Sequence, residues 1–178
     1  WYSTAGAVTY KWSPDGKWFT LCFIGHKHDP YADIGLVSAE GGKITNLTNS
    51  GYTSGSPRWV LDGNAILFIT ERYGMRAHAS WGSLNDVMLV FMNQDAYDKY
   101  RLSKEDYELQ KELEKEQKKN SEGTDKEKKP KADADKESKE AKPINVELAG
   151  IEDRIVRLTP NSSDLGGAIL TKDGETLY

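Results

Sequence analysis

The side chains best suited to chemistry gather between residues 71 and 82. Five of them are candidates for holding a substrate: Arg72, Tyr73, Arg76, His78 and Trp81. Guanidinium groups pair with carboxylates through two parallel hydrogen bonds, and aromatic rings add flat apolar area. The segment is therefore suited to a peptide carboxylate or backbone. The alternative is that the aromatic side chains pack against a neighbouring element while the arginines bond buried carbonyl groups.

No catalytic residue can be assigned from this sequence. The chain has no Gly-x-Ser-x-Gly elbow, and the stretch from Gly51 to Gly55 has the wrong spacing for one. His78 and Ser80 lie in one segment, but that spacing alone does not make a nucleophile and its base. His26 and His28 are spaced as metal ligands can be, yet no second Cys or His pair completes a site. We expect neither a metal nor another cofactor.

These segments must be positioned by a repeated structural unit. The sequence Trp12-Ser13-Pro14-Asp15-Gly16-Lys17 returns as Trp59-Val60-Leu61-Asp62-Gly63-Asn64, and in weaker form as Leu170-Thr171-Lys172-Asp173-Gly174-Glu175. Glycine adopts positive φ without steric cost and aspartate bonds nearby backbone, so each copy predicts a tight turn between two strands. The chain is therefore expected to contain repeats.

The spacing of the copies predicts one repeat period and one insertion. The aspartates lie 47 and then 111 residues apart, a difference of 64 residues. A second marker, Ile44-Thr45-Asn46-Leu47-Thr48 against Ile155-Val156-Arg157-Leu158-Thr159, gives 111 again. A period in the forties with four short strands per unit is typical of a β-propeller blade.

The predicted fold is all-β: β-propeller blades of four antiparallel strands forming a partial propeller, with a charged insertion that is helical and then disordered. We expect about two blades in 1–92, the insertion in 93–142, and the end of the interrupted blade and start of the next in 143–178. We also expect 144–148 to re-enter the sheet as a strand. A repeat array of this size is expected to need the remainder of its polypeptide to fold stably.

The insertion is dominated by charge. Residues 104–142 contain 12 basic and 13 acidic side chains, so its net charge is close to zero and it does not indicate a nucleic-acid or membrane surface. Ser103 followed by Asp106 is a capping-box pattern, which predicts a solvated helix over 104–119. From 120 to 142 almost nothing is apolar, and we expect disorder there.

Composition excludes several other functions. The net charge is −4 and leaves no basic face for a phosphate backbone, so nucleic acid is not an expected partner. No run of about 18 apolar residues is present, so no membrane span is expected. The single cysteine, Cys22, lies in an apolar strand sequence and is expected to be a buried thiol.

Three segments resemble the TolB-like propeller repeat. They are the hairpin of Trp12 to Lys17, the end of the first blade at Ile44 to Thr48, and the start of the second blade at Gly55-Ser56-Pro57-Arg58-Trp59. Together with the 71–82 segment and the charged insertion, the chain looks most like the N-terminal propeller of bacterial tricorn-protease homologues. The resemblance implies a serine peptidase with PDZ-like and tail-specific-protease-like domains elsewhere. It implies that this segment gates or docks peptide or protein substrates, in the periplasm or cell envelope. No catalytic position carries over.

Two other functions stay open. One is a TolB-like scaffold that binds proteins in the envelope. The other is the propeller of a prolyl-oligopeptidase-type enzyme with an α/β-hydrolase domain. The residues beyond Tyr178 would separate the three readings, and a homo-oligomer is compatible with each.

Overall fold

A computed structural model describes residues 9–25, 31–78, 81–121 and 142–178. The chain divides into two compact units. Unit 1 comprises Trp1–Ala96 and Ala141–Tyr178, and unit 2 comprises Tyr97–Glu140. Among the described residues, no helix has the length and apolar character needed to cross a bilayer.

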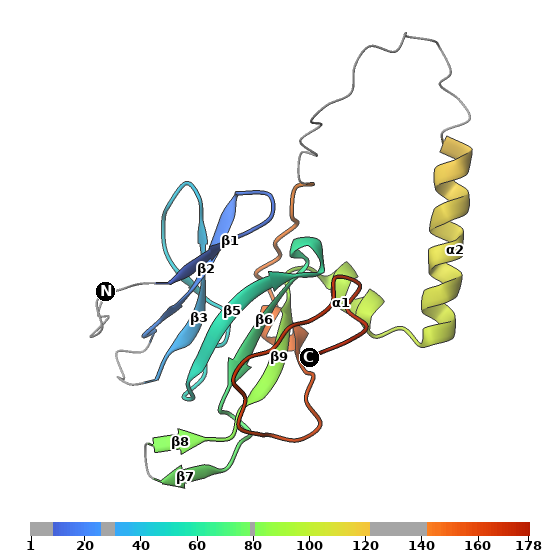
Figure 1. The fold of residues 1–178 in the computed structure, drawn as a ribbon. Coiled ribbons are helices and arrows are strands. Elements are labelled where there is room, and N and C mark those ends of the chain that lie inside the picture. Colours follow the sequence, from blue (N-terminus) through green and yellow to red (C-terminus); the bar gives the residue numbers. More distant parts are fainter. Residues whose placement is uncertain (1–8, 26–30, 79–80, 122–141) are drawn as a thin grey trace, which may run out of the picture. The chain divides into compact units, whose positions relative to one another are not determined.

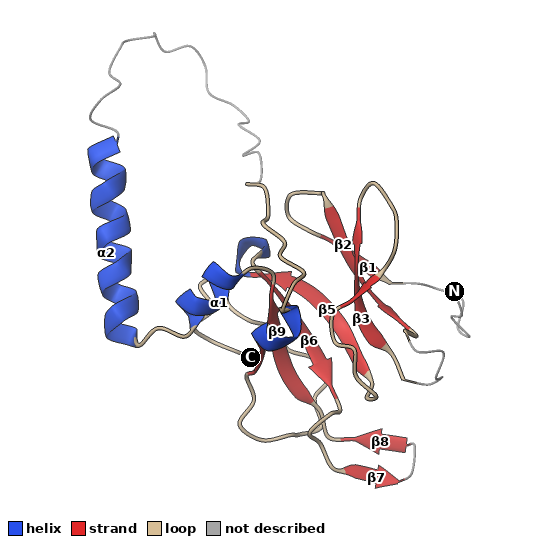
Figure 2. Ribbon diagram, turned by 180° about the vertical axis from the view of Figure 1, so that it is seen from behind, coloured by secondary structure: helices blue, strands red, loops and turns tan. Residues whose placement is uncertain are grey.

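Unit 1 is built mainly from two four-stranded antiparallel sheets (Figures 1 and 2). Sheet A is a meander of β1 (Tyr10–Trp12), β2 (Trp18–Phe23), β3 (Asp33–Ser38) and β4 (Thr45–Asn46). Sheet B pairs β5 (Ser54–Val60), β6 (Ala65–Thr70), β9 (Asp86–Phe91) and β10 (Ile155–Arg157) in that order. A separate hairpin joins β7 (Arg76–His78) to β8 (Trp81–Ser83). The fold is thus predominantly β, as the sequence predicts.

The two sheets repeat the same register. Trp12 lies opposite Phe19 in sheet A, and Trp59 lies opposite Ile66 in sheet B, so both partners are displaced by 47 residues. Because opposite residues share a sheet face, equal register places equivalent side chains on equivalent faces. The 47-residue repeat that the sequence predicts is confirmed for the first two strands of each sheet.

The additional residues of the second copy lie in two places, and the expectation of one 64-residue insertion is wrong. In the third strand the displacement is 53, since Asp33 and Asp86 hold equivalent positions opposite Phe23 and Thr70. In the fourth strand it is 111, from Asn46 to Arg157. Six extra residues therefore lie between β6 and β9, and 58 between β9 and β10.

The main core lies between the two sheets. Ile34 and Leu36 of β3 point to one face because side chains alternate along a strand, and they meet Ile66 and Phe68 of β6. All four are at most 2% exposed, and Met88, Val90 and Met92 extend the same cluster. Cys22 is partly buried against this cluster, and burial raises the pKa of its thiol.

The Asp-Gly turn recurs in two of its three copies. Asp15 accepts hydrogen bonds from the Ser13 hydroxyl at 2.6 Å and the Lys17 N–H at 3.1 Å. Asp173 accepts from the Thr171 hydroxyl at 2.6 Å and the Glu175 N–H at 3.1 Å. The third copy continues as a hairpin in which Leu170 lies opposite Leu177.

The second copy departs from this turn, although it occupies the same register. Leu61–Gly63 forms a short 3₁₀ helix, η1, and both Leu61 and Asp62 have φ of 53°. The position of Ser13 and Thr171 is taken here by Val60, which has no hydroxyl to donate to the aspartate. Without that bond the turn relaxes to another conformation.

The return from the insertion is not a strand. Residues 144–148 alternate as a strand would, but Ile144 donates its N–H to the Asp15 carboxylate at 2.9 Å. The Glu147 N–H bonds the Met92 carbonyl at 2.8 Å. These two bonds do not belong to a regular β ladder. The expected strand is therefore replaced by an extended segment, which is followed by the 3₁₀ helix η2 (Ile151–Arg154).

Two helices follow β9: α1 (Gln94–Tyr100) and α2 (Lys104–Ser121). The predicted N-terminal cap of α2 is confirmed in part: the Ser103 hydroxyl accepts from the Asp106 N–H at 3.1 Å, and it donates to the Asp106 carboxylate at 2.7 Å. The disorder expected for 120–142 falls largely outside the described residues. So do His26 and His28, the pair considered as metal ligands.

Candidate functional site

The segment singled out in the sequence connects β6 to β9, at the end of sheet B (Figure 1). It folds as a hairpin in which Arg76 lies opposite Ser83 and His78 lies opposite Trp81. The first sheet has no such hairpin among its described residues. The six residues by which this connection is longer in sheet B account for the difference.

Polar side chains fasten the base of this hairpin to the sheet. Glu71 accepts from the Thr53 N–H at 3.2 Å and from the Ser83 hydroxyl at 2.7 Å, so one carboxylate joins two segments. The Leu84 N–H donates to the Met75 carbonyl at 3.2 Å. At Gly74 a Cβ would collide with the Leu84 carbonyl, so only glycine permits this close crossing.

Beside this base lies a surface formed by the side chains of Arg72, Tyr73 and Arg157, here called the Tyr73 surface. Tyr73 is 50% exposed. The Arg72 guanidinium carbon lies 5.6 Å from its ring centroid, and that of Arg157 lies 5.2 Å from it. Cations within about 6 Å of an aromatic ring are attracted to its face. The ring and two guanidinium groups offer both apolar contact and hydrogen-bond donors.

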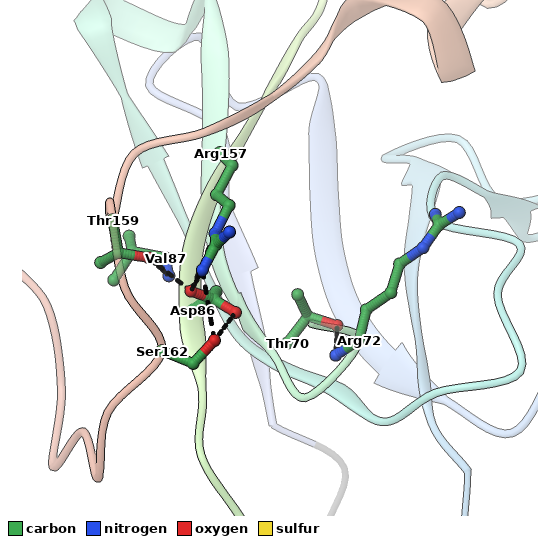
Figure 3. A network of polar contacts seen from close by, with 7 residues as sticks. All are labelled: Thr70, Arg72, Asp86, Val87, Arg157, Thr159 and Ser162. Carbon is green, nitrogen blue, oxygen red and sulfur yellow. Dashed lines mark hydrogen bonds and ion pairs between the residues drawn. The ribbon is translucent and has the colours of Figure 1, made fainter. Parts of the chain in front are cut away.

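Arg157 is held in place by the buried carboxylate of Asp86, the first residue of β9 (Figure 3). Its Nε and Nη2 donate to Oδ1 of Asp86 at 3.0 and 2.8 Å. The Thr159 hydroxyl donates to the same oxygen at 2.7 Å, and the Ser162 hydroxyl to Oδ2 at 2.7 Å. The Asp86 side chain is fully buried and that of Arg157 is 34% exposed.

These contacts keep Asp86 ionised. Burial raises the pKa of a carboxyl group, but here the hydrogen bonds from Ser162, Thr159 and Arg157, together with the Arg157 charge, outweigh it. The pKa of Asp86 is lowered as a result. The ionised Asp86 carboxylate fixes the Arg157 guanidinium beside Tyr73, so the network positions one half of the Tyr73 surface.

The structure brings together two of the five sequence-predicted site residues, Arg72 and Tyr73, through the ring contact. For Arg76, His78 and Trp81 it describes the backbone in β7 and β8, and their side chains lie outside the description. Sequence reasoning missed Arg157, which is far from Tyr73 in the chain. The repeat contained the signal, because Arg157 takes the place of Asn46, whose amide bonds Asp33 at 2.8 Å.

The described part of the site presents one tyrosine ring and two guanidinium groups. Among the residues that the structure describes, no group of three or more His, Cys, Asp or Glu side chains is placed to hold a metal ion. Ser162 contacts an aspartate that is already occupied by an arginine and a threonine. That arrangement positions side chains and does not activate a hydroxyl group.

Comparisons with known proteins give a partial picture. No family model matches the chain. A stretch of 57 residues, 32% of this chain, is 40% identical to a Bacillus subtilis (strain 168) protein named uncharacterized peptidase YuxL, of which it covers 8%. The crystal structure of the tricorn protease is similar over 90% of this chain, with a TM-score of 0.50 and 10% identity, and the chain covers 14% of it.

The chain thus spans a small part of both proteins that it resembles. At 10% identity, the likeness to the tricorn protease speaks for the fold alone. The resemblance expected from the sequence is supported to that extent: the fold is like part of a tricorn protease, and a short stretch is similar in sequence to a protein named a peptidase.

Proposed function

We propose that this chain is a noncatalytic β-propeller segment of a tricorn-like serine peptidase, and that it docks peptide substrates for a catalytic domain elsewhere in the polypeptide. The observation that carries the proposal is the equal register of sheets A and B, with a third hairpin opening in the same way. Successive four-stranded meanders packed face to face are the units from which propellers are built.

The peptidase part of the proposal has two supports. The fold likeness extends over 90% of the chain and is to a protease, and the 57-residue sequence match is to a protein named a peptidase. The two were found by different comparisons, one of structure and one of sequence. Both point to the same class of protein.

The docking part is supported by the Tyr73 surface. An exposed tyrosine with guanidinium groups on its ring can contact a peptide plane through the ring and its carbonyl or carboxylate groups through the arginines. Arg76, His78 and Trp81 belong to the adjacent hairpin, and we include them in the proposed substrate-binding set.

The test uses the full-length polypeptide and a panel of fluorogenic peptides. We expect the double variant Arg72→Ala/Tyr73→Ala to raise KM for peptides about tenfold while kcat stays near the parent value, because docking precedes chemistry. A matched control exists in unit 2, where the Arg101 guanidinium lies 5.5 Å from the Tyr97 ring centroid. Tyr97→Ala/Arg101→Ala should leave KM unchanged.

Two results would count against the proposal. An unchanged KM in the Arg72→Ala/Tyr73→Ala variant would remove peptide docking at this surface. Peptide hydrolysis by the purified 178-residue chain would overturn its noncatalytic role. The coding sequence after Tyr178 separates the remaining possibilities. A tail-protease core would support the proposal, and a Gly-x-Ser-x-Gly elbow would indicate a prolyl-oligopeptidase-type enzyme. The absence of both would indicate a TolB-like scaffold.

A further inference from the structure

One face of sheet A carries an aromatic cluster, formed by the exposed Tyr10 and Trp12 and the half-buried Phe19. Tyr10 is 55% and Trp12 52% exposed. The Trp12 and Phe19 ring centroids lie 5.4 Å apart, and those of Tyr10 and Phe19 lie 6.0 Å apart, both edge to face. Large aromatic side chains grouped in water are typical of a surface that another element covers.

The repeat shows what covers the equivalent surface in the second copy. In sheet B, 47 residues later in the chain, the positions equivalent to Tyr10, Trp12 and Phe19 are occupied by Pro57, Trp59 and Ile66. Pro57 and Ile66 are buried, Trp59 is half-buried, and Ile66 and Trp59 belong to the core between the sheets. The opposite face of sheet A, through Ile34 and Leu36, is what buries them.

A hydrogen bond marks this packing. The Trp59 indole N–H donates to the Lys11 carbonyl of sheet A at 3.1 Å. Within the described part of the chain, the Trp12 indole N–H has no acceptor. The equivalent donor is therefore present in sheet A, and no described residue supplies a carbonyl to it as Lys11 does to Trp59.

We propose that the aromatic face of sheet A is the docking surface for a further four-stranded sheet of the same repeat, located earlier in the same polypeptide. That sheet presents an apolar face of the Ile34 and Leu36 type. It covers Tyr10 and Phe19, and it offers a backbone carbonyl to the Trp12 indole at the position that Lys11 holds for Trp59. The inference rests on the propeller part of the proposed function and is independent of peptide docking.

A second copy of this chain is a poorer occupant. The face of sheet A that buries sheet B is already covered. The corresponding face of the last repeat is offered by the hairpin of Ile169 and Tyr178, which align with Lys11 and Thr20 and are 62% and 79% exposed. Two short strands cannot cover a face that spans three strands of sheet A, whereas a complete sheet can.

Cysteine labelling of Trp12→Cys, in a Cys22→Ser background, tests the proposal. We expect a water-soluble maleimide to modify Cys at position 12 rapidly in the 178-residue chain and at least about tenfold more slowly in the full-length polypeptide, because burial blocks the reagent. Lys43→Cys, in the exposed turn before β4, is the control and should react equally in both.

Three outcomes would overturn the proposal. Equal labelling at position 12 in the two proteins would show that nothing covers the face. Protection in the 178-residue chain that grows with its concentration would identify a second copy as the occupant. A reading frame with no such repeat before Trp1 would remove the proposed partner. Full-length protein that is protected at position 12 but shows no peptide hydrolysis would instead contradict only the proposed function.

Discussion

Sheets A and B are two copies of one unit, and the largest difference between them is what has been added between their strands. The strand pairings match, but sheet B carries six extra residues between β6 and β9 and 58 between β9 and β10. Additions at strand ends leave the ladder intact, because the loops lie outside the hydrogen-bonded register. The comparison shows where this fold tolerates new sequence, and the Tyr73 surface lies beside one of these additions.

In both sheets a buried aspartate at the start of the third strand accepts hydrogen bonds from the fourth strand and the residues that follow it. In sheet A the Asp33 carboxylate accepts from the Thr48 hydroxyl at 2.7 Å and the Ser50 N–H at 3.0 Å. In sheet B Asp86 holds Thr159 in the same way and adds Arg157. A buried aspartate at the start of the third strand thus fixes the fourth strand, whatever length of chain lies between them.

The largest effect is expected from removing this aspartate in sheet B. Asp86→Ala leaves Arg157 without its partner, and breaking a partly buried ion pair and its hydrogen bonds costs about 3 kcal/mol. Asp33→Ala, which removes the acceptor of the hydrogen bonds from Asn46, Thr48 and Ser50, should cost about 2 kcal/mol. Urea titrations followed by tryptophan fluorescence measure both. Equal losses would show that Arg157 adds nothing to the clamp.

Glycine substitutions in the two equivalent turns sharpen the comparison. Gly63 has φ of 93° and a Cβ there would collide with the Ile144 side chain, whereas Gly16 has φ of 69° and open space around it. Gly16→Val should therefore cost about 1 kcal/mol from backbone strain alone, and Gly63→Val about 2–3 kcal/mol from strain and overpacking. The urea midpoints give the difference. A larger loss at Gly16 would contradict the packing of Ile144 against this turn.

The sequence was sufficient for the parts of the fold that repeat locally. The turns at Asp15 and Asp173 and the cap at Ser103 depend on neighbours a few residues away, and the structure confirms these turns and the helix. It also confirms the register that the repeat predicts for the first two strands of each sheet. Two of the three residues of the Tyr73 surface, Arg72 and Tyr73, could be predicted because they are adjacent in the chain. Arg157 could not be predicted, because an ion pair with an aspartate in another strand holds it there.

Contacts between distant parts of the chain also explain two other features that the sequence did not predict. Residues 144–148 have the alternation of a strand, but distant partners take their backbone groups: Asp15 accepts the Ile144 N–H, and the Arg154 guanidinium bonds the Glu147 carbonyl. The hairpin of β7 and β8 has only two short strands, and such hairpins have little propensity of their own. In both places tertiary contacts decided the structure.

Acid should weaken the Asp86 clamp selectively. The pKa of Asp86 is lowered in the folded state, so its contribution to stability is present above the pKa of an unfolded aspartate, about 3.9, and is lost as the pH falls through the folded value. We expect Asp86→Asn to flatten the fall in unfolding free energy below about pH 4. Unfolding free energies between pH 2 and 6 measure it. An unchanged slope would mean that other carboxylates dominate the acid limb.

The smallest effect is expected from removing unit 2. The chain segments of unit 1 that flank this unit in sequence are bonded to each other, since the Asn93 amide donates to the Asn145 carbonyl at 3.3 Å and the Gln94 N–H donates to the Glu147 carboxylate at 3.0 Å. These bonds lie outside Tyr97–Glu140, the residues of unit 2. Replacing that unit by a short Gly-Ser linker should change the unfolding free energy by less than about 1 kcal/mol, because loop-closure entropy varies slowly with length. A loss above about 2 kcal/mol would show that the addition has become part of the sheet it was added to.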